Sequence, residues 1–463
     1  MASSSLQQET YFASMANQGN IIVQETPKFD LESYIQNYKG PTRFDRLMLV
    51  GRSSVPLYLD ALKLALAEAQ QSHDISRYRE VWGYLKLAGV DDAELRYNKS
   101  WVESTDAANK AETKRLEREM KVYKNNLVKE SIRMGHEELG KHLESIGDLL
   151  GATDAYNRMR PDVSTPKHIV DMGRHLVSVA MQRKEWVSVI GQLNKITGLQ
   201  GTDEEKLMQP YIRSMSGVAL LGQENYEAAA RSFLEVDGST GATISAITGG
   251  FLSANDIAVY GGLLALATMD RTKLQSNVLE NGRFRAFLEQ EPHIRRAIAQ
   301  FVNGRYAACL SILASYRADY MLDFYLQRHV NAIYTKIRNK CITNYLVPFS
   351  CVTLASMDAA FSEPGQSIES ELATMIQKGL VNARIDSINK LVRTVKDKPR
   401  VKLHKDALEV VSKFEKDTLE RLRRVNIAEA ELEVKASRKG HNMPDHMPNP
   451  NETWYETSTP VAE

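Results

Sequence analysis

The sequence has little cysteine and lacks the spacings of disulfide frameworks and zinc clusters. The 463 residues include three cysteines, an odd number, and no two of them have CxxC spacing: Cys309, Cys341 and Cys351. This pattern argues against a disulfide-built secreted fold and favours a reducing compartment. Packing inside a core is the simplest role for all three.

Long apolar runs and an excess of one charge are missing as well. The longest apolar stretch, residues 257–269, is too short to cross a bilayer and predicts a buried helix. Residues 1–18 have neither the basic start nor the apolar core of a signal peptide. The formal net charge is +1, so no overall field draws the chain to nucleic acid or anionic membranes. We expect a soluble intracellular protein that recognises its partners locally.

Catalytic motifs are also missing. The sequence contains no HExxH, no GxSxG and no glycine-rich dinucleotide loop after a strand. Residues 135–141 imitate the GxxxxGK spacing of a phosphate loop, but His142 stands where Ser or Thr should hold magnesium. His441 and His446 have no thiol companion, and two histidines with one neighbouring acid are poor evidence for a metal site. The sequence therefore predicts no catalytic site, no metal site and no cofactor.

A repeat is present over residues 101–315. Three segments share a polar turn, then an aromatic residue, then a small or apolar residue three positions further on. Their aromatics are Trp186, Tyr226 and Tyr306, which are separated by 40 and 80 residues. The doubled second interval is explained if a fourth copy, near Leu274, has lost its aromatic residue. A period near forty predicts stacked helix pairs, since a lone pair cannot bury its apolar face. We expect a mainly α, right-handed, TPR-like solenoid. A ligand-binding aromatic box is the alternative, but aromatics at fixed repeat positions usually pack between helices.

Residues 29–100 predict a helical N-terminal domain. Asp30 suits an N-cap, Gly40 and Pro41 form a break, and Tyr58, Leu62 and Leu66 follow at helical spacing. The preceding residues 1–28 are rich in Ser, Gln, Asn and Thr, and we predict that they are disordered.

Residues 316–400 contain the pattern of a winged helix. A first helix is predicted from Val352, Met357 and Phe361, and Glu363, Pro364 and Gly365 end it. Ser367 can cap a second helix. The apolar face of this second helix comprises Ile368, Leu372, Met375, Ile376 and Leu380. A hairpin follows over residues 381–395, where apolar residues alternate around a turn.

The charge of the second helix argues against DNA. Its outward face carries Glu369 and Glu371 against Lys378, the wrong sign for a surface that meets phosphates. Residues 384–424 hold 13 Lys or Arg and 7 Asp or Glu, a local excess of 13 − 7 = +6. A solvated flank is the simpler explanation of this excess, and a winged-helix nucleic-acid-binding protein is the alternative of another class.

A last helix is predicted over residues 401–437, with residues 438–463 as a disordered Pro- and Asn-rich tail. Glu415, Thr418 and Glu429 interrupt its apolar stripe, which suits a heterologous bundle better than a self-paired coiled coil. The stripe comprises Leu408, Val411, Leu422, Val425 and Leu432.

The winged-helix stretch resembles PCI domains, which the proteasome lid, the COP9 signalosome and translation initiation factor three share. The residues that carry this resemblance are Pro348, Phe349, Ser350, Leu354, Met357, Phe361, Ile368, Glu369, Leu372, Ile376, Gly379, Ala383, Ile385 and Asp386. The segment after Phe29 is similar to one signalosome subunit, through a "DLE.Y...Y.G..R..RL" pattern followed by an "AL..AL" helix. The resemblance spans the chain from Phe29 to about Leu432.

This resemblance implies a non-catalytic scaffold subunit of the signalosome, present in nucleus and cytoplasm. The complex removes a ubiquitin-like modifier from cullins through zinc in another subunit, and it would meet cullin-RING ligases as an assembly. A lid or initiation-factor subunit is the alternative. The implied lateral contacts with other PCI subunits fall on Val381, Ala383, Ile385, Ile388 and Val392. The implied helical bundle with the remaining subunits uses the stripe from Leu408 to Leu432.

Overall fold

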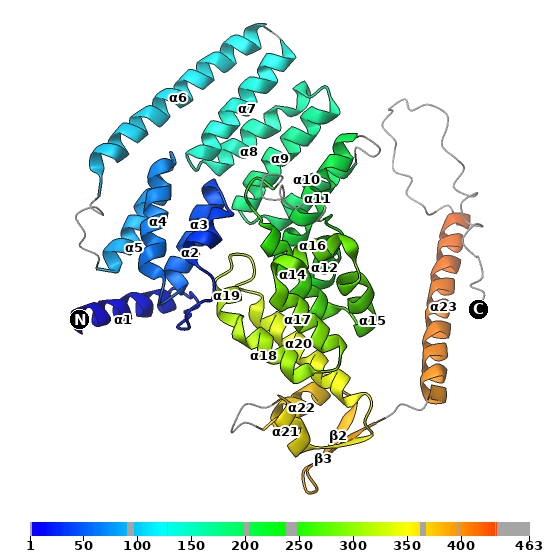
Figure 1. The fold of residues 1–463 in the computed structure, drawn as a ribbon. Helices are drawn as coiled ribbons and strands as arrows, with labels where there is room; N and C mark the ends of the chain where they lie inside the picture. Colours follow the sequence, from blue (N-terminus) through cyan, green and yellow to red (C-terminus); the bar gives the residue numbers. More distant parts are fainter. Residues whose placement is uncertain are drawn as a thin grey trace. The chain divides into compact units, whose positions relative to one another are not determined.

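The computed structural model describes residues 2–89, 97–126, 128–198, 203–237, 248–361, 367–395, 399–430 and 432. The chain divides into two compact units, residues 1–394 and 395–463. The described part is mainly helical with one small sheet, which confirms the predicted fold class (Figure 1). None of its helices is both long and apolar enough to cross a membrane.

The first unit begins with a group of N-terminal helices. These are α1 (Ala2–Asn17), α2 (Leu31–Gln36), α3 (Gly40–Ser53), α4 (Tyr58–Gln71) and α5 (Ile75–Leu87). The predicted cap is confirmed, because the Asp30 carboxylate accepts a hydrogen bond from the Ser33 N–H at 3.0 Å.

The prediction of disorder over residues 1–28 is wrong where the structure describes them. Tyr11, Phe12 and Met15 of α1 are buried in the main core, and both aromatic rings lie within 5.4 Å of the Tyr58 ring. The composition of this segment is polar, but its few large apolar side chains lie one turn apart and form a single face. That face is enough to fix the helix.

Helical repeats follow, and Figure 1 shows them stacked in chain order. They comprise α6 (Lys99–Asn126), α7 (Lys129–Ser145), α8 (Leu149–Arg158), the 3₁₀ turn η2 (Arg160–Asp162), α9 (Pro166–Gln182), α10 (Trp186–Thr197), α11 (Asp203–Gly222), α12 (Tyr226–Leu234), α14 (Ala254–Thr268), α15 (Arg271–Leu274), the π-helical turn η4 (Gln275–Leu279), α16 (Gly282–Gln290), α17 (Pro292–Val302), α18 (Tyr306–Ser315), α19 (Arg317–Met321) and α20 (Val330–Leu346). Consecutive helices pack as pairs, such as α9 with α10 and α11 with α12.

The recurring aromatics occupy one structural position. Trp186, Tyr226 and Tyr306 are the first residues of α10, α12 and α18, the second helices of their pairs. The residue two positions earlier has a positive φ in each turn, namely 58° at Lys184, 63° at Glu224 and 76° at Gly304. A chain reversal that needs this left-handed conformation explains why polar residues or glycine recur there.

The aromatics do not form a common box. Each packs within its own neighbourhood: Trp186 against Tyr325, Tyr226 against His329 and Tyr306 against Phe301. In the copy near Leu274, the short elements α15, η4 and α16 stand where the other copies have a helix that begins with an aromatic residue. The prediction of inter-helix packing is therefore confirmed.

The long apolar run forms α14, which is buried on nearly every side. Gly261 and Gly262 allow its neighbours to approach closely. A Cβ atom on Gly261 would lie 2.7 Å from Phe284, and one on Gly262 would lie 2.3 Å from Ile294. The predicted buried helix is confirmed, and its glycines fit close packing.

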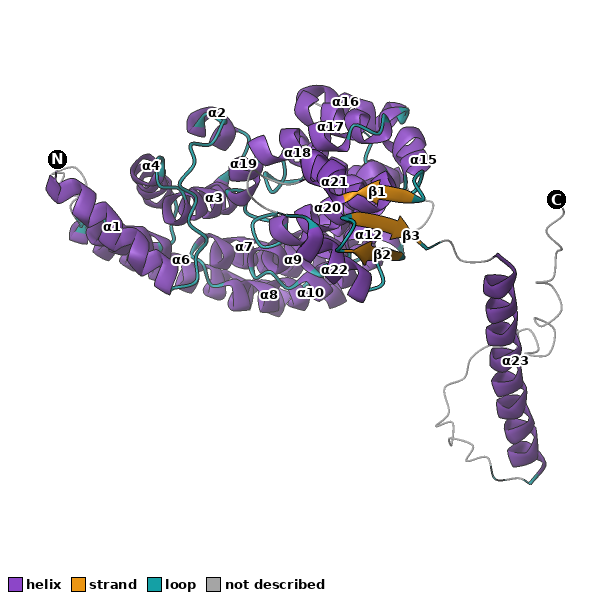
Figure 2. Ribbon diagram, turned by 90° about the horizontal axis from the view of Figure 1, so that it is seen from below, coloured by secondary structure: helices purple, strands orange, loops and turns teal. Residues whose placement is uncertain are grey.

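A winged helix ends the first unit (Figure 2). Its elements are β1 (Cys351–Thr353), α21 (Leu354–Phe361), α22 (Glu369–Gln377), β2 (Ala383–Asp386) and β3 (Leu391–Thr394). The antiparallel sheet has the order β1-β3-β2. Val352, predicted in the first helix, instead lies in β1, because a pairing with Val392 draws it into the sheet. Leu380, predicted on the core face, is exposed because α22 ends at Gln377 and Gly379 turns the chain with a φ of 70°.

The second unit contains α23 (Pro399–Glu429). The predicted start near residue 401 is late, since proline is favoured in the first helical turn and opens this helix. Leu432 lies beyond its last residue, contrary to the predicted stripe. Residues 433–463, including the predicted tail and both of its histidines, lie outside the described part.

Three histidines in the repeats make stability sensitive to acid. Burial lowers the pKa of His136, His175 and His329 below the usual value near 6.5. As the pH falls, these histidines therefore take up protons at a higher pH in the unfolded chain than in the folded chain. We expect the free energy of unfolding to fall as the pH drops from about 6.5 to about 5. Urea denaturation at several pH values tests this. His329→Gln should flatten the dependence over this window, and an unchanged slope would exclude His329 as a contributor.

Candidate functional site

The winged-helix sheet has two edges, and Val392 lies on neither. Val392 pairs with Val352 of β1 on one side and with Ile385 of β2 on the other, and its side chain is fully buried. A lateral contact through Val392 requires the second strand of the hairpin to be an outer strand, and this expectation is wrong, because β1 pairs with β3 and makes β3 central. The unpaired edges are those of β1 and β2, and such edges can accept a strand from another chain.

The five predicted residues of this surface have different environments. Val381, Ala383 and Val392 are buried, so their side chains build the core and cannot meet a partner. Ile385 is half-buried. Ile388 is 92% exposed at the tip of the β2–β3 turn. The structure thus reduces the predicted side-chain surface to Ile388 and the edge beside Ile385.

The turn that presents Ile388 is ordered by its own side chains. The Asp386 carboxylate accepts hydrogen bonds from the N–H groups of Ile388, at 3.2 Å, and Asn389, at 3.1 Å. These bonds, together with that from the Asn389 amide, lower the pKa of Asp386. A turn fixed in this way presents an apolar tip without first having to be ordered.

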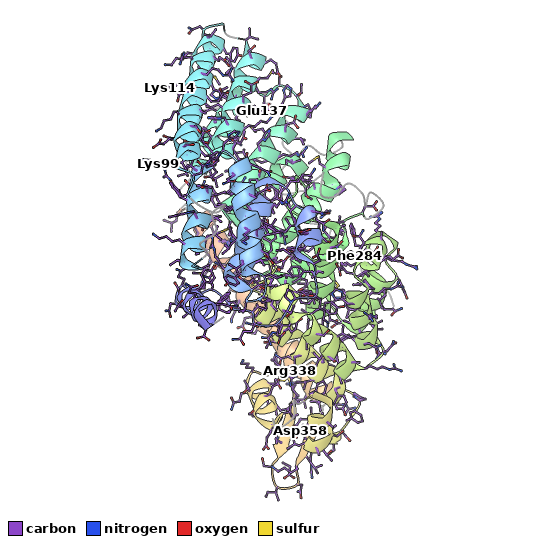
Figure 3. The ribbon with its side chains drawn as sticks, turned by 60° about the vertical axis from the view of Figure 1, so that its left-hand side comes forward. Lys99, Lys114, Glu137, Phe284, Arg338 and Asp358 are labelled. Atoms are coloured by element: carbon purple, nitrogen blue, oxygen red, sulfur yellow. The ribbon has the colours of Figure 1, made fainter. Side chains whose placement is uncertain are left out.

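The acidic residues of α22 serve the internal structure. Arg338 of α20 donates two hydrogen bonds to the Glu371 carboxylate, at 2.7 and 2.9 Å, and so joins the repeats to the winged helix. Figure 3 places Arg338 at this junction. Glu369 pairs with Lys390 and accepts a hydrogen bond from Ser387. Both acids therefore hold neighbouring elements, and neither creates a surface for phosphate.

The second candidate surface is the apolar face of α23. Four of the five predicted residues lie on it and are more than half exposed, namely Leu408, Val411, Leu422 and Val425. Further exposed apolar residues of the helix were missed by the heptad pattern: Val401, Leu403, Val410, Phe414 and Leu419. At 100° per residue the apolar positions from Val401 to Phe414 cover about half of the circumference, wider than a coiled-coil seam. This half of α23 can contact more than one helix.

The phosphate-loop imitation is part of a helix. Residues 135–141 lie within α7, and Gly140 packs against the Tyr156 ring, where a Cβ atom would come within 2.3 Å. A phosphate loop needs free backbone N–H groups, which a helix interior does not offer. In the described part of the chain, no three His, Cys, Asp or Glu residues gather as metal ligands.

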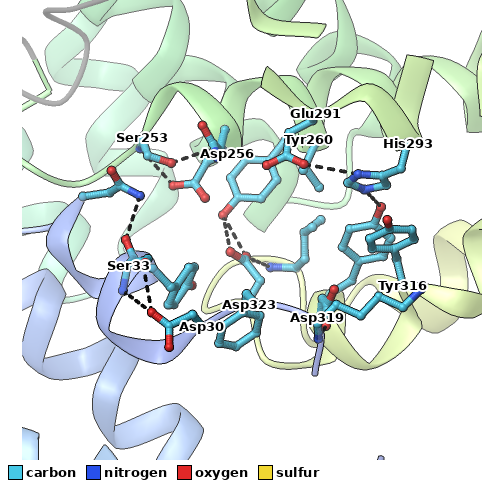
Figure 4. A pocket seen from close by; sticks show the side chains of 18 of the residues that line it. Asp30, Ser33, Ser253, Asp256, Tyr260, Glu291, His293, Tyr316, Asp319 and Asp323 are labelled. Atoms are coloured by element: carbon cyan, nitrogen blue, oxygen red, sulfur yellow. Dashed lines mark hydrogen bonds and ion pairs between the residues drawn. The ribbon is translucent and has the colours of Figure 1, made fainter. Parts of the chain in front are cut away.

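A buried ion cluster joins the N-terminal helices to the repeats, and Figure 4 shows three of its members, Asp256, Tyr260 and Asp323. Its centre is Arg46 of α3, whose side chain is fully buried. Arg46 donates to the carboxylates of Asp256, at 3.1 Å, and Asp323, at 2.8 Å. The guanidinium also lies 4.0 Å from the centre of the Tyr38 ring. We call Arg46, Asp256, Asp323 and the tyrosines bonded to them, Tyr34, Tyr38 and Tyr260, the Arg46 cluster.

Sequence reasoning missed the Arg46 cluster. Its carboxylates, Asp256 and Asp323, lie 210 and 277 residues from Arg46 along the chain. Tyr34, Tyr38 and Arg46 itself fall within the "DLE.Y...Y.G..R..RL" pattern, but that pattern does not reveal the distant carboxylates. One signal was present, the arginine at a position of α3 whose neighbours Leu47 and Val50 are core residues. An arginine on a buried face requires carboxylate partners.

Comparisons with known proteins agree with this architecture. The family model of 26S proteasome subunit RPN7 matches residues 98–277, and that of the PCI domain matches residues 313–396. A Neurospora crassa protein named COP9 signalosome complex subunit 1 is 48% identical, covering 94% of this chain and 95% of the relative. Subunits of the same name from Emericella nidulans and Arabidopsis thaliana are 44% and 33% identical, each covering 89% of this chain and, respectively, 84% and 92% of the relative.

Proposed function

Since the chain belongs to the family of COP9 signalosome complex subunit 1, we propose that it is a non-catalytic scaffold subunit of that complex. In this proposal it supports removal of the ubiquitin-like modifier from cullins and so regulates cullin-RING ligases. The isopeptidase activity lies in another subunit. The nucleus and the cytoplasm are the proposed locations.

The observation that carries the proposal is the apolar face of α23. Large apolar side chains that stay exposed over four turns of a helix mark a surface that another protein covers. A bundle with helices of other subunits would cover it. The tip of the β2–β3 turn at Ile388, which we call the wing tip, and the free edge of β2 supply a second, lateral contact with a neighbouring PCI subunit. Two separate assembly surfaces suit a scaffold.

A nucleic-acid-binding winged helix is less well supported. Glu369 and Glu371 are paired with Lys390 and Arg338, so these cations are already engaged, and α22 itself carries no basic residue. Positive charge is needed where a helix meets phosphates. Only half of the basic excess of residues 384–424 falls on α23, where 8 Lys or Arg stand against 5 Asp or Glu up to Arg424, and this helix also carries the apolar face.

The wing tip offers a direct test of the lateral contact. Ile388→Asp should leave the fold intact, because the side chain is 92% exposed, but should weaken capture of the neighbouring PCI subunit. Burial of one isoleucine contributes about 1.5 to 3 kcal/mol, so we expect roughly ten- to a hundredfold weaker binding. The measurement is affinity purification of the tagged full chain from native extract, with the co-purified subunits quantified.

Val187→Asp provides the matched control, since Val187 of α10 is 77% exposed and lies on the repeats, away from the sheet. This variant should recover every subunit that the unchanged chain recovers. Signalosome subunits must co-purify with the unchanged chain for the proposed function to stand. Full recovery of both neighbours by Ile388→Asp would place the lateral contact elsewhere.

A further inference from the structure

A cavity of about 440 Å³ lies beside the Arg46 cluster. The α2 segment forms one wall, and α14, α17 and the α19 region form the others (Figure 4). Phe29, Val259 and Leu326 contribute apolar surface to the lining, and tyrosines such as Tyr34 and Tyr316 contribute aromatic rings. The volume suits a small group with an apolar stem.

Tyr316 in this cavity already contacts a cation. One face of its ring stacks on the His293 imidazole, with the ring centres 3.8 Å apart. The Lys28 ammonium lies 3.9 Å from the centre of the same ring, so it must occupy the opposite face. Lys28 is exposed, and its backbone N–H is held by the Asp319 carboxylate at 2.8 Å. The lysine side chain can therefore leave while its backbone stays in place.

Negative charge exceeds positive charge around the cavity. Five lining residues are acidic, namely Asp30, Asp256, Glu291, Asp319 and Asp323. The side-chain cations beside them are Arg46, which is bonded to Asp256 and Asp323, and Lys28, whose ammonium lies over Tyr316. The His293 ring lies 3.2 Å from Glu291. Burial raises the pKa of Asp319 and of Asp256, and Arg46 only partly offsets the effect on Asp256. A second cation would therefore stabilise the carboxylates in their ionised form.

We propose that this cavity binds an ammonium or guanidinium group on an aliphatic stem, with Lys28 as an internal competitor for the outer face of Tyr316. The cationic head lies against Tyr316 near Glu291 and Asp319, and the stem lies along the apolar lining. The basic side chain of a partner polypeptide and a free polyamine share this chemistry. No residue of the winged helix or of α23 lines the cavity, so binding there can be tested independently of the two proposed assembly surfaces.

The test measures binding of four small probes to the full chain by calorimetry. N-acetyl-lysine methylamide and N-acetyl-arginine methylamide represent side chains, spermidine represents a polyamine, and N-acetyl-norleucine methylamide is the uncharged control. We expect the cationic probes to bind and norleucine not to bind. Tighter binding of the amino-acid probes identifies a polypeptide source, and tighter binding of spermidine identifies a free polyamine. Equal binding of norleucine, or no binding by any probe, overturns the proposal.

Three variants and one control variant separate the site from a general electrostatic effect. Lys28→Ala should tighten binding, because it frees the ring of Tyr316. Tyr316→Leu should weaken binding by a factor between about two and thirty, the range of a cation–π contact. Glu291→Gln should weaken it as well, whereas Glu227→Gln, an exposed acid outside the cavity, should leave it unchanged. Misfolding cannot tighten binding, so a Lys28→Ala variant that binds no better than the unchanged chain contradicts the competitor role and the proposed site.

Discussion

Replacing Arg46 with alanine is expected to lower the free energy of unfolding by about 3 to 5 kcal/mol, the loss that follows when a buried ion pair keeps only one partner. The variant would leave Asp256 and Asp323 buried without the cation between them. The hydroxyl groups of Tyr34 and Tyr260 would lose their contacts with the guanidinium. No other described arginine has a fully buried side chain.

Urea denaturation and limited proteolysis check this expectation. Arg43→Ala is the matched control: it removes an arginine from the same helix, but its ion pair with Glu68 is partly exposed. We expect the control to cost no more than about 1 kcal/mol. Because Arg46 joins α3 to α14 and to the segment before α20, its loss should also expose the segment between α1 and α2, which pairs with the end of α3 through a bridge from Val23 to Ser54, to protease. Equal stability of the two variants would show that Arg46 does not hold the two regions together.

A double substitution tests the electrostatic origin of the loss. If the cost of Arg46→Ala comes from unpaired charge, adding Asp323→Asn should recover part of the stability, since it removes one buried carboxylate. The amide can still accept the N–H bonds from Tyr325 and Leu326 that Asp323 accepts now, at 3.0 and 2.9 Å. Further loss on adding Asp323→Asn would assign the effect to packing.

Features encoded by local spacing were predictable from the sequence. The aromatics that begin α10, α12 and α18 repeat at fixed intervals, and the apolar run of α14 shows its burial directly. The Asp30 cap needs only three residues of context. Each of these features is decided within one helix or one turn, where residue type and period are informative.

Features decided by distant pairing were not predictable. The alternation of Ala383, Ile385 and Val392 indicates a hairpin, but strand order depends on β1, which pairs across α21 and α22. The same holds for the Arg46 cluster, whose carboxylates come from two distant segments. For α1, a polar composition concealed one narrow apolar face. The spacing of apolar residues predicts which face of a helix or strand is buried, but it does not predict which distant segment packs against that face.

Changing Leu422 and Val425 to aspartate is expected to abolish assembly into the complex while leaving the first unit folded. Both side chains are more than half exposed on α23, and the described part of the second unit contains no other helix to cover them. If a bundle buries them, each side chain contributes about 1.5 to 3 kcal/mol to the free energy of assembly. Burying an unpaired aspartate in the same place adds a desolvation cost to the loss of this contribution. The double substitution should therefore weaken assembly more than the single substitution Ile388→Asp.

The measurement pairs recovery of the complex by affinity purification with the melting temperature of the isolated chain. The control variant carries Ser412→Asp and Ile427→Asp, which add the same two charges away from the centre of the apolar face. Ile427 is 44% exposed, so the control also replaces an accessible apolar side chain. The control should assemble normally and melt with the unchanged chain.

The two readouts together distinguish a bundle helix from a helix that folds back on its own chain. A bundle helix contributes nothing to the isolated subunit, so the Leu422 and Val425 variant should melt at the same temperature and lose its partners. A helix that covers its own chain would give the opposite pair of results, a large drop in melting temperature with assembly preserved. The breadth of the face from Val401 to Phe414 favours the bundle, because a single helix packed alongside covers a narrower stripe than half of the circumference. Substitutions at Val410 and Phe414, on one margin of this face, should therefore remove a different set of partners from those lost with Val401 and Leu408 on the other margin.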